Sequence, residues 1–162
     1  MADIFSTKKR GEIMSRIKCS GTAVENTLHS IVRESIGMRW RVDRNSRILP
    51  GKPDIVIPTL RLVIFADGCF YHVCPEHGHA PKSNKKYWLP KLAQTRQRDK
   101  RNRRELRRMG FTVWRFWEHS LRGRLLHKTR FTIMGKLRRL ILERRLPTRS
   151  KHRRSVPDSI IQ

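Results

Sequence analysis

The order of the predicted elements indicates a single α/β domain in which helices flank a small mixed β-sheet. Amphipathic helical patterns and short runs of branched and aromatic residues alternate along the chain. The length of 162 residues, of which 37% are hydrophobic, suits one domain with a core and leaves little room for a second. We therefore expect a basic N-terminal arm at 1–21, a folded domain at 22–146 and a basic, disordered tail at 147–162.

The first half of the chain predicts one helix and a β-hairpin. Thr22 and Glu25 have the spacing of a capping box, and the apolar residues behind them recur with helical periodicity, which predicts a helix over about 22–36. Short runs of alternating or branched residues then predict a strand at 39–42 and a second strand at 54–57. A turn at 58–59 leads to a third strand at 60–65. The last two strands form the hairpin.

The second half predicts two basic helices separated by one strand. Residues 68–83 contain Gly, Pro, Cys and His without periodicity, which predicts an irregular loop. Next we expect a helix, a strand and an amphipathic helix at 91–109, 111–117 and 129–145. Trp114 and Trp117 lie in the predicted strand, which has an alternating pattern, so we assign both to the sheet.

The charge of the chain points to a polyanionic partner. Its 38 Lys and Arg residues against 13 Asp and Glu give a formal net charge of +25. Nucleic acid is favoured over an anionic membrane surface or a merely soluble exterior, because most of the cations are arginines, which fork onto phosphate oxygens. No apolar run is long enough to span a membrane, which excludes an integral membrane protein. The chain has no signal-peptide pattern and only three cysteines, so we expect a cytoplasmic protein.

Two carboxylates lie at the same end of the predicted hairpin. Asp54 opens one strand, and the companion strand ends at Ala66 and Asp67. A rigidly held carboxylate with a neighbouring backbone carbonyl suits a hard cation such as Mg²⁺, which takes oxygen ligands. The alternative is that Asp54 only caps the preceding turn.

The irregular loop also has the ligand spacing of a zinc site. Cys69, Cys74 and His77 would supply three ligands, and His119, directly after the strand at 111–117, is the best candidate for the fourth. The alternative is a pair of buried free cysteines with surface histidines. The density of Cys and His in a segment without periodicity favours a metal.

Aromatic and basic residues form two further patterns of nucleic-acid binding. Exposed aromatics beside cations stack on bases or wedge between them, and such positions are Phe70, Tyr71, Tyr87 and Trp88. A phosphate-facing helix is indicated by a run of cations at Arg96, Arg98, Lys100, Arg101, Arg103 and Arg104. The single acid in that run, Asp99, either pairs with an arginine one turn away or orients a histidine.

Taken together, these motifs closely resemble the very short patch repair (Vsr) DNA mismatch endonucleases. The resemblance covers about residues 8–125 and is carried by the segments 22–25, 50–54, 63–72, 87–88, 98–99 and 117–119. It implies a restriction-endonuclease-like fold with a zinc-stapled loop. It also implies a Mg²⁺-dependent nick 5′ to the T of a T:G mismatch in double-stranded DNA, a mispair that arises when 5-methylcytosine deaminates. The implied protein is a monomer in the bacterial nucleoid that works with mismatch-repair proteins and a cytosine-5 DNA methyltransferase system.

The resemblance also assigns roles to residues of the catalytic site. Asp54 matches the metal-binding aspartate, and the carbonyl of Ala66 stands where the family supplies a second metal oxygen. His72 matches the histidine thought to act as general base, and Asp99 matches the carboxylate that supports it. Glu25 matches a residue that binds a water on the metal, although its role in the capping box requires no catalysis.

The remaining assignments concern DNA and zinc. The aromatics that wedge beside the mismatch are matched by Phe70, Tyr71 and Trp88, and residues near the minor groove by Met14 and Ile17. The structural zinc site is matched by Cys69, Cys74 and His119. The spacing leaves His77 and His79 as alternatives for a zinc ligand, and leaves open whether Asp67 binds metal or shapes the turn. Two rival functions are a non-catalytic zinc-containing DNA-binding protein and a same-fold nuclease that prefers another DNA structure.

Overall fold

The computed structural model describes residues 9, 12, 20–79, 81 and 83–145. Met14, Ile17 and most of the expected arm lie outside the described residues, and so does the expected tail at 147–162. The elements are, in order, α2 (Ala23–Ile36), β1 (Asp43–Arg44), β2 (Ile55–Ile57), the 3₁₀ turn η1 (Pro58–Leu60), β3 (Leu62–Asp67), α3 (Lys85–Arg108), β4 (Thr112–Trp117), η2 (Glu118–Leu121) and α4 (Leu125–Arg145).

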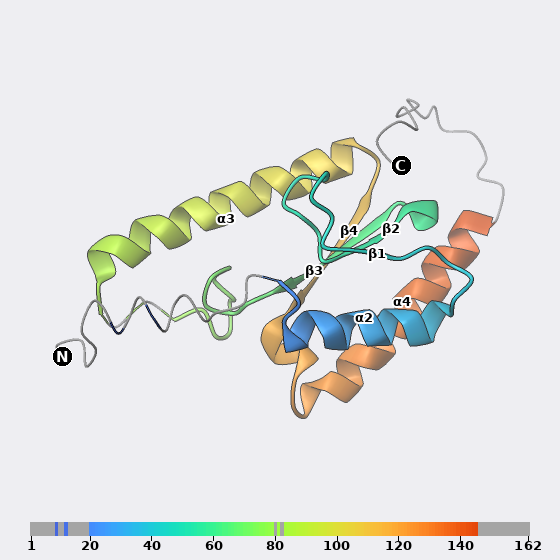
Figure 1. The fold of residues 1–162 in the computed structure, drawn as a ribbon, viewed down its shortest axis with the longest axis horizontal. Coiled ribbons are helices and arrows are strands. Elements are labelled where there is room, and N and C mark those ends of the chain that lie inside the picture. Colours follow the sequence, from blue (N-terminus) through green and yellow to red (C-terminus); the bar gives the residue numbers. More distant parts are fainter. Residues whose placement is uncertain (1–8, 10–11, 13–19, 80, 82, 146–162) are drawn as a thin grey trace.

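The four strands form one mixed sheet in the order β1-β2-β3-β4. The pairs β1–β2 and β2–β3 are antiparallel, which confirms the predicted hairpin. The pair β3–β4 is parallel, with Phe65 opposite Arg115 and Asp67 opposite Trp117. Parallel neighbours need a long crossover connection, and α3 lies within it (Figure 1).

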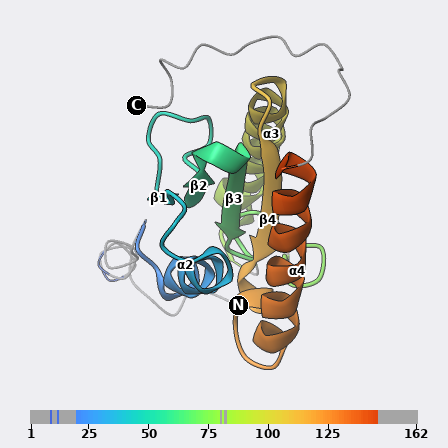
Figure 2. The same cartoon turned by 90° about the vertical axis from the view of Figure 1, so that its right-hand side faces the viewer.

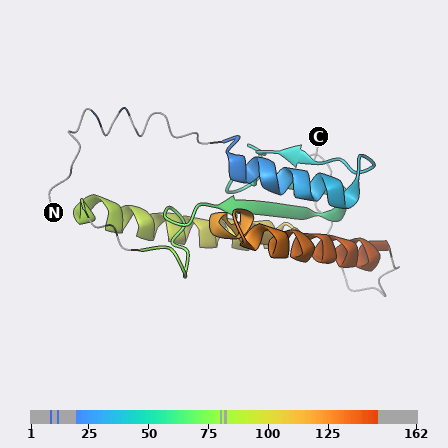
Figure 3. The same ribbon diagram turned by 90° about the horizontal axis from the view of Figure 1, so that it is seen from below.

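Helices cover both faces of the sheet. Figures 2 and 3 show α2 and α4 together on one face and α3 on the other. Alternate side chains of β3 follow this division: Leu62 and Ile64 join the core beneath α2 and α4, whereas Val63 and Phe65 pack with Leu106 of α3. The predicted α/β architecture with a mixed sheet is therefore confirmed. Among the described residues, none of the helices combines the length and apolar character needed to cross a bilayer.

The predicted capping box begins α2. The Thr22 side chain accepts a hydrogen bond from the Glu25 amide at 3.3 Å, and the Glu25 carboxylate accepts one from the Thr22 hydroxyl at 2.9 Å. The helix ends at Gly37, whose φ of 69° lies in the left-handed region that glycine adopts without strain.

Four elements are displaced by two or more residues from the prediction. The strand expected at 60–65 is β3 at 62–67, because residues 58–60 form the turn η1. The strand expected at 39–42 is instead the short β1 at 43–44, because the Trp40 carbonyl accepts from the Arg33 side chain at 2.8 Å and its ring packs on the core. The helix expected at 91–109 begins at Lys85 and continues through Pro90. Proline removes one N–H donor there, within the first two turns, and later hydrogen bonds of the helix do not depend on it. Helix α4 begins at Leu125 rather than at 129.

Candidate active site and metal centre

The candidate catalytic residues gather where β3 ends. Asp54 stands just before β2, Ala66 and Asp67 end β3, His72 lies in the turn that follows, and Asp99 projects from α3. A cavity of about 370 Å³ opens beside them, lined by Gly51, Lys52, Phe65, Asp67, His72, Arg98, Asp99, Asn102 and Arg103. Titratable groups that converge on a cavity are typical of an active site.

His72 and Asp99 are hydrogen bonded to each other in this site. The distance from His72 Nδ1 to Asp99 Oδ2 is 2.5 Å, and Asp67 Oδ1 lies 3.8 Å from the same nitrogen. Burial alone lowers the pKa of His72, but the hydrogen bond to Asp99 and the charges of Asp67 and Asp99 outweigh it, so the pKa is raised. Of the two predicted roles for Asp99, orienting a histidine is the one that the contacts favour. Its only other ion pair among the described residues is a longer one, 3.7 Å, to Arg98.

Asp54 is held by the end of β3. Its Oδ2 accepts a hydrogen bond from the Ala66 amide at 2.7 Å. Burial raises the pKa of Asp54 to about 7, and the charges of Glu25 and Asp67 add to this rise, partly offset by the Ala66 amide and His72. The Asp54 carboxylate, whose proton affinity is raised by neighbouring acids, lies beside a backbone carbonyl, and these oxygens fit Mg²⁺ because a divalent cation would offset the repulsion.

Glu25 belongs to both the helix cap and this cluster of acids. It is 8% exposed and accepts from the Gly21 amide at 2.8 Å and the Thr22 amide at 3.4 Å. Its charge nevertheless acts on Asp54. The capping role is therefore present, and a role near the metal is compatible with it.

Asp67 has a partner that we did not predict from the sequence. Its carboxylate accepts a short hydrogen bond from Arg115 Nε of β4, and Asp67 is 7% exposed. One signal was available: Arg115 is the only charged residue within the apolar strand Thr112–Trp117. A cation in a strand that packs on both faces requires a buried acid nearby.

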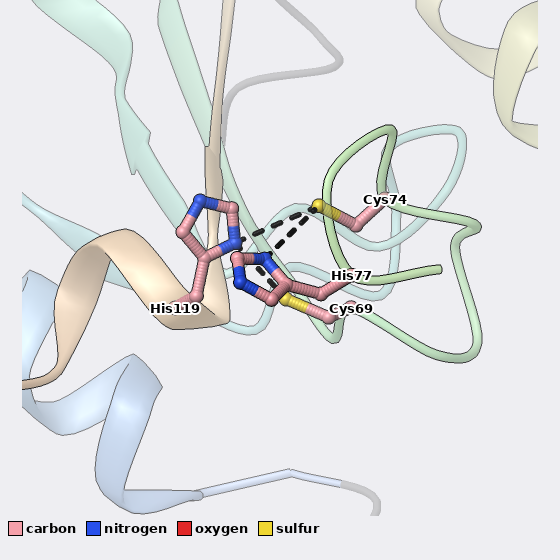
Figure 4. Close-up of side chains that lie close together, drawn as sticks. All are labelled: Cys69, Cys74, His77 and His119. Atoms are coloured by element: carbon pink, nitrogen blue, oxygen red, sulfur yellow. Dashed lines mark hydrogen bonds between the residues drawn. The ribbon is translucent and has the colours of Figure 1, made fainter. Parts of the chain in front are cut away.

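The four predicted zinc ligands lie together in the structure. Figure 4 shows Cys69, Cys74, His77 and His119 converging from the loop after β3 and from η2. One ligand atom from each lies within 4.8 Å of all the others, whereas His79 is not part of this group. His77, rather than His79, is thus placed to be a ligand.

The distances in this group fit a tetrahedral ion. The Nδ1 of His119 lies 3.2 Å from Cys69 Sγ and 3.6 Å from Cys74 Sγ, and Cys74 Sγ lies 4.0 Å from His77 Nδ1. Ordinary Zn–S and Zn–N bond lengths in a tetrahedron place S and N about 3.6 Å apart. His119 Nε2 lies 3.5 Å from the Glu76 carboxylate, as expected of a ligand whose second nitrogen is oriented by an acid.

The loop is closed by a tight turn behind the sulfurs. The Gly78 amide donates to the Cys74 carbonyl at 2.7 Å, and a Cβ atom at Gly78 would lie only 2.4 Å from that oxygen. Only glycine allows this close approach.

The predicted aromatic residues form one cluster between the loop and the start of α3. The ring centroids of Phe70 and Trp88 lie 5.1 Å apart, those of Phe70 and Tyr71 5.3 Å, and those of Tyr87 and Trp88 5.1 Å, all edge to face. Figure 1 shows the N-terminal part of α3 projecting past the sheet beside this loop. Tyr71 is 40% exposed and Tyr87 is 54% exposed, so the cluster offers ring faces to a partner.

Most cations of the predicted run lie on the exposed surface of α3, whereas Arg103 is half-buried and lines the cavity. Arg96 is exposed, and Arg98 reaches the rim of the cavity next to His72. A shallow groove on the same stretch of the helix, which shares Arg98 with the cavity, is lined by Gln94, Gln97, Arg98, Lys100, Arg101 and Arg104. This basic surface leads directly to the cavity, which suits a phosphate backbone that must pass His72.

Known proteins share this sequence pattern. The family described as DNA mismatch endonuclease Vsr matches residues 2–78. The DNA mismatch endonuclease Vsr of Escherichia coli (strain K12) is 36% identical over 129 residues, which cover 76% of this chain and 78% of that protein. The type II nicking enzyme V.NmeAIP of Neisseria meningitidis is 38% identical over 135 residues, covering 80% and 91%. The type II nicking enzyme V.NaeI of Lentzea aerocolonigenes is 41% identical over 114 residues, covering 68% of each chain.

Proposed function

Because this chain belongs to the Vsr family and is a DNA endonuclease, we propose that it nicks double-stranded DNA 5′ to the T of a T:G mismatch in a Mg²⁺-dependent reaction. The observation that carries the proposal is the His72–Asp99 pair, 2.5 Å apart, in a cavity beside Asp54. By the same resemblance we propose a restriction-endonuclease-like fold, a monomer, and repair of deaminated 5-methylcytosine as the biological setting.

Asp54 and the carbonyl of Ala66 are the proposed holders of Mg²⁺. When bound there, the ion would supply positive charge to the phosphate and to the leaving 3′ oxygen. The two contacts that His72 makes with acids both use Nδ1, so Nε2 is the atom that takes a proton from the attacking water. Asp99 fixes the orientation of the ring and stabilises the imidazolium that forms.

The aromatic cluster is the proposed source of mismatch selectivity. A T:G wobble pair is weaker than a matched pair, so inserting Phe70, Tyr71 or Trp88 beside it requires less deformation energy. Met14 and Ile17, outside the described residues, are proposed to approach the minor groove. Arg96 and Arg98 are proposed to contact phosphates, which orients the duplex without reading its sequence.

The Cys/His group is the proposed site of a structural Zn²⁺. When bound, zinc would link the loop after β3 to η2. That loop carries Phe70, Tyr71 and His72, so the link would hold the wedge and the general base on one rigid unit. Cys69, Cys74, His77 and His119 are the proposed ligands. Burial raises the pKa of the Cys69 thiol, with Cys74 and Glu118 adding to the rise, and the charge of a metal would reverse this effect.

The decisive test is cleavage of a strand-labelled duplex that carries one T:G mismatch, beside its fully matched twin. Mg²⁺ is omitted and then added back, because a chelator would also remove zinc. We expect a single nick 5′ to the mispaired T, only with Mg²⁺. Asp54→Asn should abolish it, while Asp43→Asn, which neutralises an acid paired with Arg41 on β1, should retain it.

Other outcomes separate the rival functions. Tight, salt-dependent binding without any Mg²⁺-dependent product would indicate a non-catalytic DNA-binding protein. Equal nicking of matched and mismatched duplexes would support nuclease activity but exclude specificity for the mismatch. Preferential cutting of a branched duplex would show that the preferred substrate is a different DNA structure.

A further inference from the structure

Asp67 is a buried acid that the proposed mechanism leaves without a role. It ends β3 at 7% exposure. One of its oxygens, Oδ2, accepts from Arg115 Nε, and the other, Oδ1, lies 3.8 Å from His72 Nδ1. Within the described residues only Oδ2 is hydrogen bonded, because 3.8 Å exceeds hydrogen-bond distance and the single N–H of His72 Nδ1 faces Asp99. Oδ1 therefore acts on the His72 ring through its charge, and the ion pair with Arg115 offsets the negative charge that would attract a metal.

Arg115 contacts three groups of the site at once. Besides Asp67, its Nη2 donates to the backbone carbonyl of His72 at 3.4 Å. Its guanidinium carbon lies 3.9 Å from the centre of the Trp117 ring, on which the planar group stacks. Its side chain is only 24% exposed. These contacts fix the guanidinium in one place, at the point where the turn bearing His72 leaves the sheet.

The parallel register of β3 and β4 makes this arrangement possible. Phe65 is opposite Arg115 and Asp67 is opposite Trp117, so the Arg115 side chain lies diagonally beside that of Asp67 on the α3 face of the sheet. The backbone of Arg115 is part of the sheet, and its side chain links the sheet to Asp67 and to the turn at His72. A buried charge pair with additional hydrogen bonds holds one geometry firmly, because breaking it leaves an uncompensated charge.

We infer that Arg115 is a positioning residue, which holds Asp67 and the backbone of His72 so that Asp67 and Asp99 together orient the His72 ring. In this arrangement Asp67 is a second supporting acid and not a Mg²⁺ ligand. The inference rests on the proposed function, in which His72 takes a proton from water. It assigns a role to β4, a strand that contributes no group to the reaction itself.

The test uses the zinc-loaded protein and the variants Arg115→Met, Arg115→Lys, Asp67→Asn and the Arg115→Met/Asp67→Asn double. Arg115→Met should lower kcat on the T:G duplex by about tenfold to a hundredfold with KM changed less than about threefold, as expected for a misplaced general base. Arg115→Lys, which keeps a charge, should recover part of the loss. The double variant should be more active than Arg115→Met, because the unpaired carboxylate is gone.

Two results would overturn the inference. If Asp67→Asn raises the Mg²⁺ concentration for half-maximal activity by about tenfold or more, Asp67 binds the metal. If Arg115→Met raises KM and leaves kcat unchanged, Arg115 contacts DNA phosphate instead. The matched control is Arg130→Met, which removes the partner of Glu34 between α4 and α2 and should change neither constant.

A second measurement does not depend on activity. The amides of His72, Val73 and Cys74 are hydrogen bonded within the turn, so their hydrogen exchange reports its stability. Arg115→Met should accelerate their exchange, Arg115→Lys should do so less, and Arg130→Met should not. Unchanged exchange in Arg115→Met would reject the positioning role. If the wild type fails to nick T:G DNA, the proposed function is wrong, and the exchange data still decide whether Arg115 holds the turn.

Discussion

Replacing Asp54 with Asn should remove activity and at the same time stabilise the Mg²⁺-free protein. Burial, with the nearby charges of Glu25 and Asp67, raises the pKa of Asp54 from 3.8 to about 7. At 1.36 kcal/mol for each pKa unit, this difference of about 3 units means that ionised Asp54 destabilises the folded state by roughly 4 kcal/mol above pH 7. Because Asp54 is partly exposed, screening by solvent reduces this destabilisation of the folded state to about 2 kcal/mol.

The sign of the pH dependence follows from proton binding. Between about pH 4 and pH 7 the folded state holds a proton on Asp54 that the unfolded state has released. The free energy of unfolding of the Mg²⁺-free wild type should therefore fall as the pH rises through this window. Asn is neutral at every pH and keeps an oxygen that can accept from the Ala66 amide. The free energy of unfolding of the variant should therefore decrease less between about pH 4 and pH 7 than that of the wild type.

Urea unfolding at about pH 5 and about pH 8 measures this difference, in buffer without Mg²⁺ and without chelator so that zinc is retained. Mg²⁺ should then stabilise the wild type at the higher pH and should stabilise Asp54→Asn much less. The same pH dependence of the free energy of unfolding and the same stabilisation by Mg²⁺ in both proteins would contradict this role of Asp54. In that case the carboxylates do not form one repelling cluster.

Three further predictions concern the cap, the zinc site and the wedge. Thr22→Ala should lower the free energy of unfolding by about 1 kcal/mol and leave nicking intact, whereas Glu25→Gln should slow nicking at temperatures where it is fully folded; equal activity of the two variants would limit Glu25 to the cap. Elemental analysis should find one zinc per chain in the wild type and in His79→Ala but less in His77→Ala. If His79→Ala loses zinc and His77→Ala retains it, His79 is the ligand. Trp88→Ala should reduce the ratio of nicking on mismatched to matched DNA more than it weakens binding, and equal losses on both duplexes would assign it to general DNA affinity.

Local sequence patterns were sufficient for the elements whose signals lie within a few residues. The capping box at Thr22 and the periodicity behind it predicted α2, and branched runs predicted the hairpin of β2 and β3. The boundary errors have different causes. Residues 39–42 alternate like a strand, but tertiary packing of Trp40 on the core decides their conformation. Pro90 resembles a helix stop but lies within the first two turns of α3, where few hydrogen bonds of the helix depend on its missing N–H.

The sequence alone predicted the chemistry of this protein. Its charge, its strand-end acids and its Cys/His spacing favour a polyanionic partner, a hard cation and a zinc ion. Which groups meet depends on the tertiary structure. It places His77 rather than His79 beside Cys69, Cys74 and His119, brings Asp99 next to His72, and pairs Asp67 with Arg115. The physical reason is that a parallel strand pair joined by a long helix brings together residues nearly fifty positions apart, and no local periodicity records that register.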